Sequence, residues 1–376
     1  MKKLFICGVT GSIGMQTLEV LRSEIFNKKI ELVGCSIFSS LEKAKKIIEE
    51  FSPKILAVSD ITIDTPKEYK GCRIIKSETS VEEAIELLKP DISLVATSGA
   101  AGIKHTFAAI EFSKRIALAN KESVVCCGNI LTDKINTLNK KLIPVDSEHS
   151  AIFQLLLGDS NFEKIILTAS GGSLRDKSIE EFNSATVESV LNHPVWAMGK
   201  RITVDSASMV NKALEYIEAY YLFNTKNIEI VINRNSHVHS IVKYYDGVMK
   251  FHFGYPDMKN PIAFSLSYPE RVYKNSVPDI TSCEIKFEKV DYEKYSILKL
   301  LPKILGNLSL QTAFNASDEI AVEYFLNKKI EFSKIYKIIE KTVEKIDYEK
   351  INAFKIEDIL EIDALSRKIA REIISC

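Results

Sequence analysis

Two carboxylates stand close together in the segment PVDSEHSAIF, residues 144–153. Asp146 and Glu148 follow the apolar run Leu142–Val145, a pattern typical of a buried strand. On a continuing strand they would be one period apart and would point the same way, which suits a divalent cation. A second interpretation is that Asp146 and Ser147 begin a helix, because both residue types are common helix N-caps.

A polar helix face is predicted after residue 206. Ile202 and Val204 alternate as in a strand that ends at Ser206, and the following segment has apolar residues at helical spacing. Three polar residues share another face of that helix through i,i+3 and i,i+4 spacing: Asn211, Lys212 and Glu215. An ordinary solvated Lys–Glu pair, which contributes little to stability, would explain two of them.

A serine–glycine–glycine turn is predicted at residues 170–172, after the apolar segment that ends in LTA. Its backbone amides could hold an anion, and a plain turn fits the same letters equally well. The functional interpretation is that a phosphate is clasped by Ser170, Ser206, Asn211 and Lys212. Glu215 would then turn toward the cation of Asp146 and Glu148, since three carboxylates with water or substrate oxygens suit Mg²⁺ or Mn²⁺.

The N-terminal segment carries a G-x-x-G-x-x-G pattern made by Gly8, Gly11 and Gly14. It lies between an expected strand, Lys3–Cys7, and an expected helix, Ser12–Ser23. In that context glycines permit a tight turn and a close approach of pyrophosphate to the helix N-terminus. The sequence therefore predicts a dinucleotide site.

The end of the second expected strand bears on which dinucleotide is bound. An NAD site usually has an acid there, and this chain has none between Gly34 and Glu42. That favours NADP, with Ser39, Ser40 and Lys43 available to a 2′-phosphate. A serine-rich turn is also an ordinary helix start, so this indication is the weaker one.

The segment IALANKE, residues 116–122, places Asn120, Lys121 and Glu122 directly after another apolar strand. The carboxyl ends of strands in open α/β sheets are where ligands bind. A helix cap at Asn120 followed by solvated charges is the alternative.

Composition excludes several classes of protein. The chain has 376 residues, and 50 basic residues balance 50 acidic ones, so nothing points to nucleic acid or an anionic membrane surface. No apolar stretch reaches the ~20 residues of a membrane helix, and the glycine-broken N-terminus does not resemble a secretion signal. Seven scattered cysteines without a CxxC pair indicate a reducing cytoplasm rather than a disulfide framework or a zinc site.

The elements that position these residues predict an α/β protein. Strands alternate with helices up to residue 145, which predicts a Rossmann-like parallel sheet domain at residues 1–145. Strand-like runs with an antiparallel character follow in a central α/β catalytic domain at 146–268, where Arg201–Val204 is one expected strand. A linker is expected at 269–290 and a C-terminal helical domain at 291–376.

With these pieces in order, the chain resembles the 1-deoxy-D-xylulose 5-phosphate reductoisomerase family, NADPH-dependent enzymes of isoprenoid synthesis that form 2-C-methyl-D-erythritol 4-phosphate. The resemblance rests on long stretches in the family's order: GVTGSIGMQTLEV, LANKESVV, LIPVDSEHSAIFQ, LTASGGSLR, HPVWAMGKRITVDSASMVNKALEYIEA and FGYPDMKNPIA.

The resemblance implies a role for each matching residue. Metal ligands are then Asp146, Glu148 and Glu215, which with Lys121 and His193 form the catalytic set. Substrate contacts are Lys121, Ser147, Glu148, Ser170, His193, Ser206, Asn211, Lys212 and Glu215. Cofactor contacts are Thr10, Gly11, Ser12, Ile13, Asn120, Glu122 and Gly199, with Ser39 and Ser40 added from the loop discussed above.

The resemblance also implies partners and a moving part. We expect NADPH, Mn²⁺ or Mg²⁺, a small sugar-phosphate substrate, phosphonate hydroxamate inhibitors, and a cytoplasmic homodimer that binds neither nucleic acid nor membrane. His193 and Trp196 would lie on a mobile flap spanning roughly residues 182–198. His149 matches no family ligand and is interpreted as structural.

Two departures from the family pattern stand out. The loop at Phe38–Ser40 is longer than the family's Gly-x-Asn segment, which leaves the 2′-phosphate contacts in doubt. The tail has Asn-Ala-Ser-Asp-Glu at residues 315–319, where the family usually has Asn-Ala-Ala-Asn-Glu. Two rivals would share the glycine loop: a semialdehyde-type dehydrogenase with a cysteine nucleophile, and an NADP-binding sensor without catalysis.

Overall fold

The structure is a computed structural model that describes residues 1–159, 161–196, 198–347 and 353–375. By their internal contacts the residues fall into two compact units. The first contains residues 1–123, 131–150 and 257–275, and the second contains the remainder of the chain. The four-part division with boundaries at 145, 268 and 290 stays a prediction; in the compact units, residues 257–275 group with the first unit.

The first unit is built on an eight-stranded sheet in the order β4-β5-β3-β2-β1-β6-β7-β8. Neighbouring strands are parallel except β4, which pairs antiparallel with β5. The strands are β1 Lys2–Cys7, β2 Ile30–Ile37, β3 Ile55–Val58, β4 Glu68–Tyr69, β5 Cys72–Lys76, β6 Ile92–Val95, β7 Arg115–Leu118 and β8 Lys141–Pro144. The strand order reverses between β1 and β6, so the crevice at their carboxyl ends is where a doubly wound sheet binds ligands.

Amphipathic helices cover this sheet and close its core. They are α1 Ser12–Arg22, α2 Glu24–Lys29, α3 Leu41–Phe51, α4 Ser80–Leu88, α5 Ala101–Phe112 and α12 Lys259–Ser267, with the beginnings of α6 Lys121–Thr137 and α7 Ser147–Leu155. The α12 helix comes from far along the chain and packs on α1, β7 and β8. Its Ile262 and Leu266 join Leu4, Ile6 and Leu18 in one buried cluster. The expected Rossmann-like parallel sheet is confirmed.

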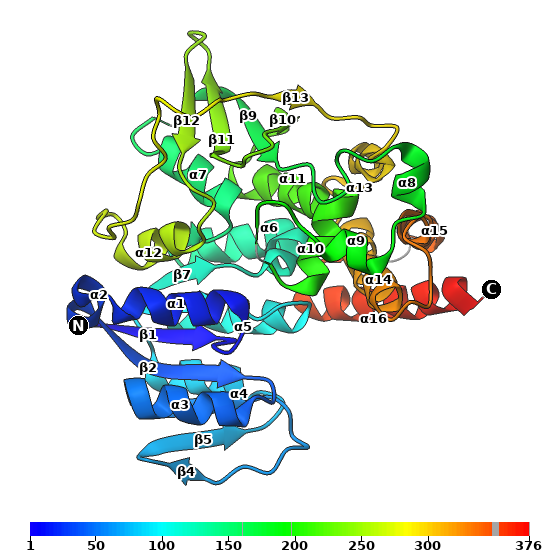
Figure 1. Ribbon diagram of the computed structural model, residues 1–376. Coiled ribbons are helices and arrows are strands. Elements are labelled where there is room, and N and C mark those ends of the chain that lie inside the picture. The colour runs from blue at the N-terminus through cyan, green and yellow to red at the C-terminus, as the bar shows by residue number, and fades with distance from the viewer. Residues whose placement is uncertain (160, 197, 348–352, 376) are drawn as a thin grey trace. The chain divides into compact units, whose positions relative to one another are not determined.

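The second unit has a five-stranded mixed sheet in the order β12-β11-β9-β10-β13 (Figure 1). Its strands are β9 Phe162–Ala169, β10 Ile228–Ile232, β11 Val238–Tyr244, β12 Met249–Phe253 and β13 Glu288–Lys289. The turn Asp246-Gly247 joins β11 and β12 as an antiparallel hairpin, and only β9 and β10 pair in parallel. The expected antiparallel character of this region is therefore correct.

Helices make up the remainder of the second unit. They are α8 Ile179–Asn183, α9 Val187–Leu191, α10 Lys200–Ser208, α11 Val210–Leu222, the 3₁₀ helix η1 Ser296–Leu300, α13 Leu301–Ile304, α14 Leu308–Leu326, α15 Lys334–Lys345 and α16 Ile356–Ser375. The last three pack against one another (Figure 1), which confirms the expected helical C-terminal region. None of the helices described is long and apolar enough to cross a membrane.

Two expectations about local structure are wrong. Arg201–Val204 is not a strand but the first part of α10. Its Ile-Thr-Val letters favour a strand by their β-branching, but the buried residues of α10 follow helical spacing, because tertiary packing overrides local propensity. Similarly, β8 ends at Pro144 and Glu148 lies in the first turn of α7, so Asp146 and Glu148 are not a strand-spaced pair.

Candidate active site

The glycine loop joins β1 to α1 as the sequence predicts. Gly8 has a φ of +77°, and a Cβ there would lie 3.0 Å from the carbonyl oxygen of Ala96. A Cβ on Gly14 would come within 2.5 Å of the carbonyl oxygens of Gly8 and Val9, so the helix packs directly on the loop. Only glycine permits both approaches.

The first turn of α1 is open toward solvent. Gly11 is its N-cap and makes no side-chain cap, no acid lies in the first turn, and Gly11 and Ser12 are exposed. Thr10 and Ile13 are half-buried on either side of them. These four residues therefore surround a helix N-terminus whose amides and dipole favour a negatively charged group.

Ser39 and Ser40 lie beyond the end of β2, the strand next to β1. Both are exposed, and Ser40 is the N-cap of α3 without using its hydroxyl as a cap. Their hydroxyls thus stand at the carboxyl edge of the sheet, where the loop after β2 meets an adenine ribose in this fold. The contacts to a 2′-phosphate stay a prediction.

Asn120 and Glu122 hydrogen-bond to the backbone of the loop that follows β6. The Asn120 amide donates to the Thr97 carbonyl at 2.9 Å, and the Glu122 carboxylate accepts from the Gly99 amide at 2.9 Å. Asn120 also caps α6 by accepting from the Ser123 amide at 2.9 Å. Of the two interpretations of Asn120, the helix N-cap is therefore confirmed. The cofactor contacts of Asn120 and Glu122 stay predictions.

Lys121 and Asp146 form an ion pair at the carboxyl ends of β7 and β8. The two strands are neighbours, with Leu118 paired to Pro144, so the residues that follow them are brought together. Both side chains are largely buried, at 14% and 16% exposure. A buried ion pair needs further hydrogen-bonding partners to be stable. This pair holds the Asp146 carboxylate and the Lys121 ammonium next to each other.

Asp146 also begins α7, since its carbonyl accepts from the Ser150 amide at 2.8 Å. In the first turn the Ser147 hydroxyl donates to the Glu148 carboxylate. His149 is fully buried, and its Nδ1 lies 3.6 Å from the Asp146 carboxylate. Burial beside a carboxylate is compatible with a packing role and with a ligand role, so the structural role expected of His149 stays a prediction.

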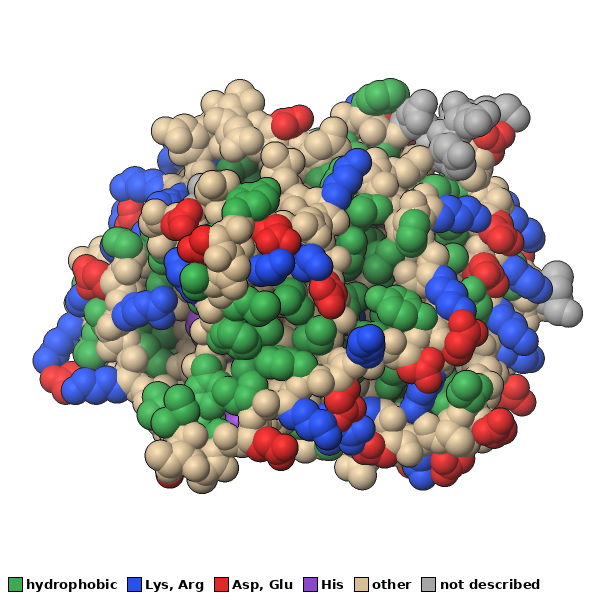
Figure 2. Space-filling model, turned by 90° about the horizontal axis from the view of Figure 1, so that it is seen from above, with side chains coloured by type: hydrophobic (Ala, Val, Ile, Leu, Met, Phe, Trp, Pro, Cys, Tyr) green, Lys and Arg blue, Asp and Glu red, His purple; other side chains and the backbone are tan. Residues whose placement is uncertain are grey.

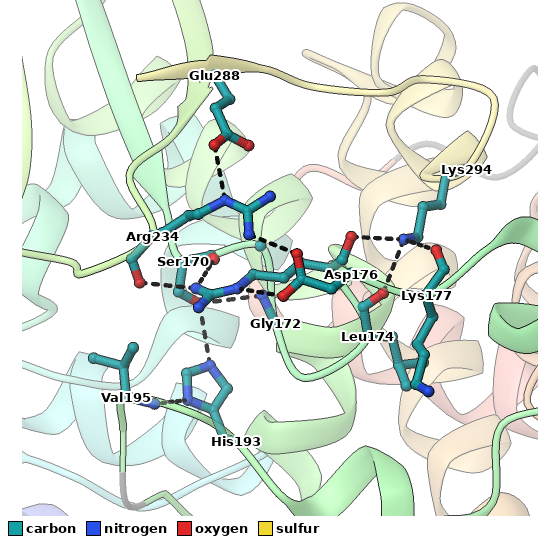
Figure 3. A network of polar contacts seen from close by, with 12 residues as sticks. Ser170, Gly172, Leu174, Asp176, Lys177, His193, Val195, Arg234, Glu288 and Lys294 are labelled. Carbon is teal, nitrogen blue, oxygen red and sulfur yellow. Dashed lines mark hydrogen bonds and ion pairs between the residues drawn. The ribbon is translucent and has the colours of Figure 1, made fainter. Parts of the chain in front are cut away.

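Three segments of the second unit meet at His193. Its Nε2 lies 3.1 Å from the Ser170 hydroxyl (Figure 3). The same atom lies 3.3 Å from the Ser206 hydroxyl. Its Nδ1 accepts from the backbone amides of Val195 and Trp196 at 3.1 and 2.9 Å. Because Nδ1 is an acceptor, the ring proton is on Nε2 and faces the two hydroxyls.

The charge state of His193 follows from its surroundings. Partial burial, with a smaller effect from the Arg175 guanidinium, lowers the pKa of His193 to about 4. The ring is therefore neutral at physiological pH and presents an N–H donor rather than a positive charge. Ser170, His193 and Ser206 together form a compact set of neutral hydrogen-bonding groups.

Gly172 explains how Ser170 reaches α10. Its φ is +72°, and a Cβ there would lie 2.6 Å from the Ser206 carbonyl oxygen and 2.7 Å from the Ala207 Cα. The turn thus packs backbone against backbone on α10. The Gly172 amide in turn donates to the Ser170 hydroxyl at 3.2 Å.

The polar face of α11 has the geometry that its spacing predicts. The Lys212 ammonium and the Asn211 amide both donate to the Glu215 carboxylate. Lys212 is 4% and Glu215 1% exposed, so this is not a solvated surface pair. The helix α11 begins at Val210, after its N-cap Met209, whose φ of +64° separates it from α10.

The segment expected to form a flap is partly helical, with α8 and α9 preceding His193. Trp196 is half-buried, and its ring centroid lies 6.3 Å from that of His239. Gly199 caps α10 with an ordinary negative φ and open space around its Cβ position, so the fold itself does not demand glycine there. Ala197, inside the expected flap, lies outside the described residues.

Comparison with known proteins identifies the family. The family model for 1-deoxy-D-xylulose 5-phosphate reductoisomerase matches residues 4–128, and models for the C-terminal domain of that enzyme match residues 142–223 and 253–369. The Thermotoga neapolitana 1-deoxy-D-xylulose 5-phosphate reductoisomerase is 44% identical over 376 residues, covering 99% of this chain and 97% of that protein. The Thermotoga maritima enzyme is 47% identical over 346 residues, covering 92% and 90%.

The chain belongs to the 1-deoxy-D-xylulose 5-phosphate reductoisomerase family. Solved structures agree with this. A crystal structure of a family member with NADPH, fosmidomycin and magnesium superposes with a TM-score of 0.92 at 34% identity, covering 100% of this chain and 98% of that one. The Zymomonas mobilis reductoisomerase with NADPH gives 0.89 at 32% identity and covers 99% of each chain.

Within this reductoisomerase the expected metal ligands are divided between the compact units. Asp146 and Glu148 belong to the first unit and Glu215 to the second. The expected substrate residues divide in the same way, since Lys121 and Ser147 lie in the first unit.

One departure from the family pattern has a structural consequence. Asp318, one of the two residues that depart from the expected family pattern, is fully buried on α14 and lies 3.6 Å from the Arg201 guanidinium. Burial, and then the Asp205 carboxylate, raise the pKa of Asp318 well above its usual range. The raised pKa favours the protonated form of Asp318, whereas the nearby Arg201 guanidinium acts in the opposite direction. Ser317, the other departure, donates to the Ala313 carbonyl of its own helix at 2.6 Å.

Sequence reasoning missed the residues that hold the Ser170 turn. Arg175 donates from Nη1 to the carbonyls of Ser170 and Arg234 at 2.9 and 2.8 Å. Arg175 stands inside the matching stretch LTASGGSLR, which was a usable signal. Lys294 and Tyr295 also contact this turn, and nothing in their surrounding letters singles them out.

Proposed function

We propose that this chain rearranges 1-deoxy-D-xylulose 5-phosphate and reduces the product with NADPH to 2-C-methyl-D-erythritol 4-phosphate. The observation that carries the proposal is the contact of His193 with both Ser170 and Ser206. These residues come from two of the stretches that match the family, LTASGGSLR and the stretch that begins HPVWAM, and they converge as one polar site. Full-length membership of the family gives the reaction class.

The phosphate of the substrate is bound by the second unit. Ser170 and Ser206 offer hydroxyls, the Asn211 amide and Lys212 ammonium offer further donors, and His193 offers its Nε2 proton. Lys212 supplies positive charge from a nearly buried position, where it is screened little by solvent. Binding the unreactive phosphate supplies remote binding energy that orients the reacting end.

One divalent cation, Mg²⁺ or Mn²⁺, is held by Asp146, Glu148 and Glu215. The fit is chemical: all three donors are carboxylates, which hard divalent cations prefer, and Glu215 is already oriented by Lys212 and Asn211. When bound, the cation supplies Lewis acidity toward the substrate carbonyl and its neighbouring hydroxyl. Substrate oxygens would complete its coordination.

Lys121 lies beside this cation site through its ion pair with Asp146. Its ammonium is a donor for a substrate oxygen that gains negative charge as the carbon skeleton rearranges. Ser147, in the first turn of α7, is the further contact to the substrate backbone that the family resemblance implies. The segment around Trp196 covers the reacting end and excludes water when it closes.

NADPH is bound by the first unit at the glycine loop. The fit lies in the uncapped N-terminus of α1 and in the glycine contacts that a Cβ would block. Bound NADPH supplies the hydride. The pyrophosphate is received by Thr10, Gly11, Ser12 and Ile13, while Asn120 and Glu122 hold the loop after β6. Ser39 and Ser40 meet the 2′-phosphate. Gly199, which belongs to the second unit, is included as a cofactor contact only because the family resemblance implies it.

The rival with a cysteine nucleophile has little support. Cys7, Cys35, Cys72, Cys126 and Cys127 are buried, and burial raises the pKa of Cys127 to about 12. A reactive thiol needs the opposite, a lowered pKa and access to solvent. The sensor without catalysis has no need of the buried Lys212–Glu215 pair or of a third carboxylate.

The proposal is tested by following NADPH oxidation with 1-deoxy-D-xylulose 5-phosphate after complete chelation of metal, and again after adding Mn²⁺. Oxidation that needs both the sugar phosphate and the cation, with 2-C-methyl-D-erythritol 4-phosphate as the product, supports it. A rate that is unaffected by chelation, or no oxidation with this substrate under any metal, contradicts it. A phosphonate hydroxamate inhibitor should block the reaction in competition with the sugar phosphate.

The working form is a cytoplasmic homodimer. The five-stranded sheet ends in β12, an edge strand whose Met249 and Phe251 are 47% and 43% exposed, and Tyr245 and Val248 of the adjoining hairpin are exposed as well. Figure 2 shows that hydrophobic side chains gather into a patch among charged ones in the view from above. An exposed apolar face with an open strand edge suits a second copy of the chain. Phe251→Glu should yield a monomer in sedimentation, whereas an unchanged mass would exclude this face as the dimer interface.

No membrane or nucleic-acid partner is expected, because the 50 basic and 50 acidic residues balance.

A further inference from the structure

The Lys294 ammonium is almost buried and donates to three backbone carbonyls of a single turn. Its side chain is 9% exposed, and Nζ lies 2.8 Å from the Leu174 oxygen, 2.9 Å from the Arg175 oxygen and 2.6 Å from the Lys177 oxygen (Figure 3). A lysine ammonium has three donors, so all of them are used. Such an arrangement fixes the positions of the carbonyls as well as that of the lysine.

Its neighbour Tyr295 holds the other end of the same turn. The Tyr295 hydroxyl donates to the Gly171 carbonyl at 2.9 Å, and the ring packs edge-on against Phe182 with centroids 5.8 Å apart. Tyr295 is 4% exposed. Two consecutive residues of one segment therefore bind carbonyls near both ends of the turn, at residue 171 and at residues 174–177.

The turn needs such partners because it is irregular. Residues 170–177 lie between β9 and α8 and belong to no helix or strand, so the ladders of regular structure cannot satisfy their carbonyls. Arg175 adds a third tie by donating to the Ser170 carbonyl at 2.9 Å. With the carbonyls held from outside, the Ser170 hydroxyl and the Gly172 amide stay directed toward His193 and α10.

We propose that Lys294, with Tyr295, is a positioning residue for recognition of the substrate phosphate: it fixes the 170–177 turn so that Ser170 is preorganised before the ligand arrives. The inference rests on the proposed function of this site and deepens it. Lys294 does not touch the substrate; its effect passes through the turn. Loss of the clamp weakens binding of the sugar phosphate and leaves binding of NADPH unchanged.

The test uses Lys294→Ala with Lys299→Ala as the matched control. Lys299 lies on η1 and pairs with Glu293 at 2.6 Å with its side chain 46% exposed, so its loss removes an ammonium from the same region without touching the turn. We expect Lys294→Ala to raise the KM for the sugar phosphate about tenfold, the effect of one lost charge-assisted hydrogen bond, with KM for NADPH unchanged. Lys299→Ala should behave as the wild type.

Chemical rescue separates positioning from general loss of structure. Propylammonium replaces the atoms that Lys294→Ala deletes, so it should restore much of the KM for the sugar phosphate, whereas the neutral analogue propanol should not. Hydrogen exchange of the backbone amides of residues 170–177, measured without any ligand, should be faster in Lys294→Ala and slowed again by propylammonium. This readout is independent of the reaction, so a wild type that fails to reduce 1-deoxy-D-xylulose 5-phosphate refutes the proposed function and still leaves the clamp testable.

Tyr295→Phe decides the matter if Lys294→Ala does not fold. It keeps the ring against Phe182 and removes the hydroxyl alone, so we expect a KM for the sugar phosphate about fivefold higher and faster exchange at residues 170–173. Unchanged exchange over the turn in the variants that fold, or values of KM that rise together for the sugar phosphate and NADPH, would overturn the proposal.

Discussion

Replacing Gly172 by alanine is expected to disable the phosphate site by pushing the Ser170 turn away from α10. Two costs combine at this position. The φ of +72° is a conformation that costs an L-residue about 1–2 kcal/mol. The new Cβ would also lie 2.6 Å from the Ser206 carbonyl oxygen, where ordinary contact begins at 3.4 Å, so the backbones must separate by 3.4 − 2.6 = 0.8 Å.

That displacement acts on the groups that bind the substrate. Ser170 and Ser206 both lie just over 3 Å from His193 Nε2, at 3.1 and 3.3 Å, so a shift of this size breaks at least one of the two contacts. A misplacement near 1 Å in a positioned site costs roughly 100-fold in rate. We therefore expect kcat/KM for the sugar phosphate to fall roughly 30- to 100-fold in Gly172→Ala.

Two other glycines provide matched controls. Gly158 has a φ of +88° with no atom within 4 Å of its Cβ position, so Gly158→Ala carries the backbone strain alone. Gly171 has a φ of +84° and would meet the Arg175 side chain at 3.0 Å, which is an intermediate case. Steady-state kinetics and urea unfolding of the three variants separate strain from displacement. Equal kcat/KM in Gly172→Ala and Gly158→Ala would refute the reasoning.

Three further outcomes are expected. Trp196 is the only tryptophan, so its emission should shift or quench when a phosphonate hydroxamate is added with Mn²⁺ and NADPH, whereas emission that ignores the ligands would exclude a covering role. NADPH should exceed NADH at least tenfold in kcat/KM, since contacts from Ser39 or Ser40 to the 2′-phosphate are worth about 1.5–3 kcal/mol each, and equal values would contradict this. The pKa of Asp318 is raised in the folded state, so folding favours its protonated form. The stability that this gives is fully present below about pH 4, the pKa of an unfolded Asp, and is lost as pH rises through the folded pKa. Asp318→Asn should therefore be more stable than the wild type at pH 8 and should flatten the decline toward alkaline pH in thermal unfolding, and a destabilised variant at pH 8 would show that the carboxylate is charged and stabilising.

The first unit could be predicted well because its signals are local. The glycine loop, the short apolar strands and the amphipathic helix Leu41–Phe51 each have a pattern that survives in the structure. What failed depended on packing at a distance. Arg201–Val204 has the β-branched letters of a strand and folds as part of α10.

The candidate site followed a similar rule. Asn211, Lys212 and Glu215 were predicted as one helix face, and their mutual contacts agree with the spacing. The pairing of Asp146 with Glu148 was inferred from a strand that ends at Pro144, so the reason was wrong although the residues are the ones the family resemblance names. Lys294 could not have been found, because its partners are backbone carbonyls 117 to 120 residues away and carbonyls leave no trace in a sequence.

The central claim of the proposal is that Asp146, Glu148 and Glu215 hold one divalent cation. The most direct measurement is a Mn²⁺ titration of the chelated protein by electron paramagnetic resonance, comparing the wild type with Asp146→Asn and Glu215→Gln. The account predicts one tight site per chain in the wild type. Its affinity should fall at least ~10-fold in each variant, because each variant removes a carboxylate ligand. Glu215→Gln that binds one Mn²⁺ with the affinity of the wild type and turns over 1-deoxy-D-xylulose 5-phosphate at the same rate would contradict it.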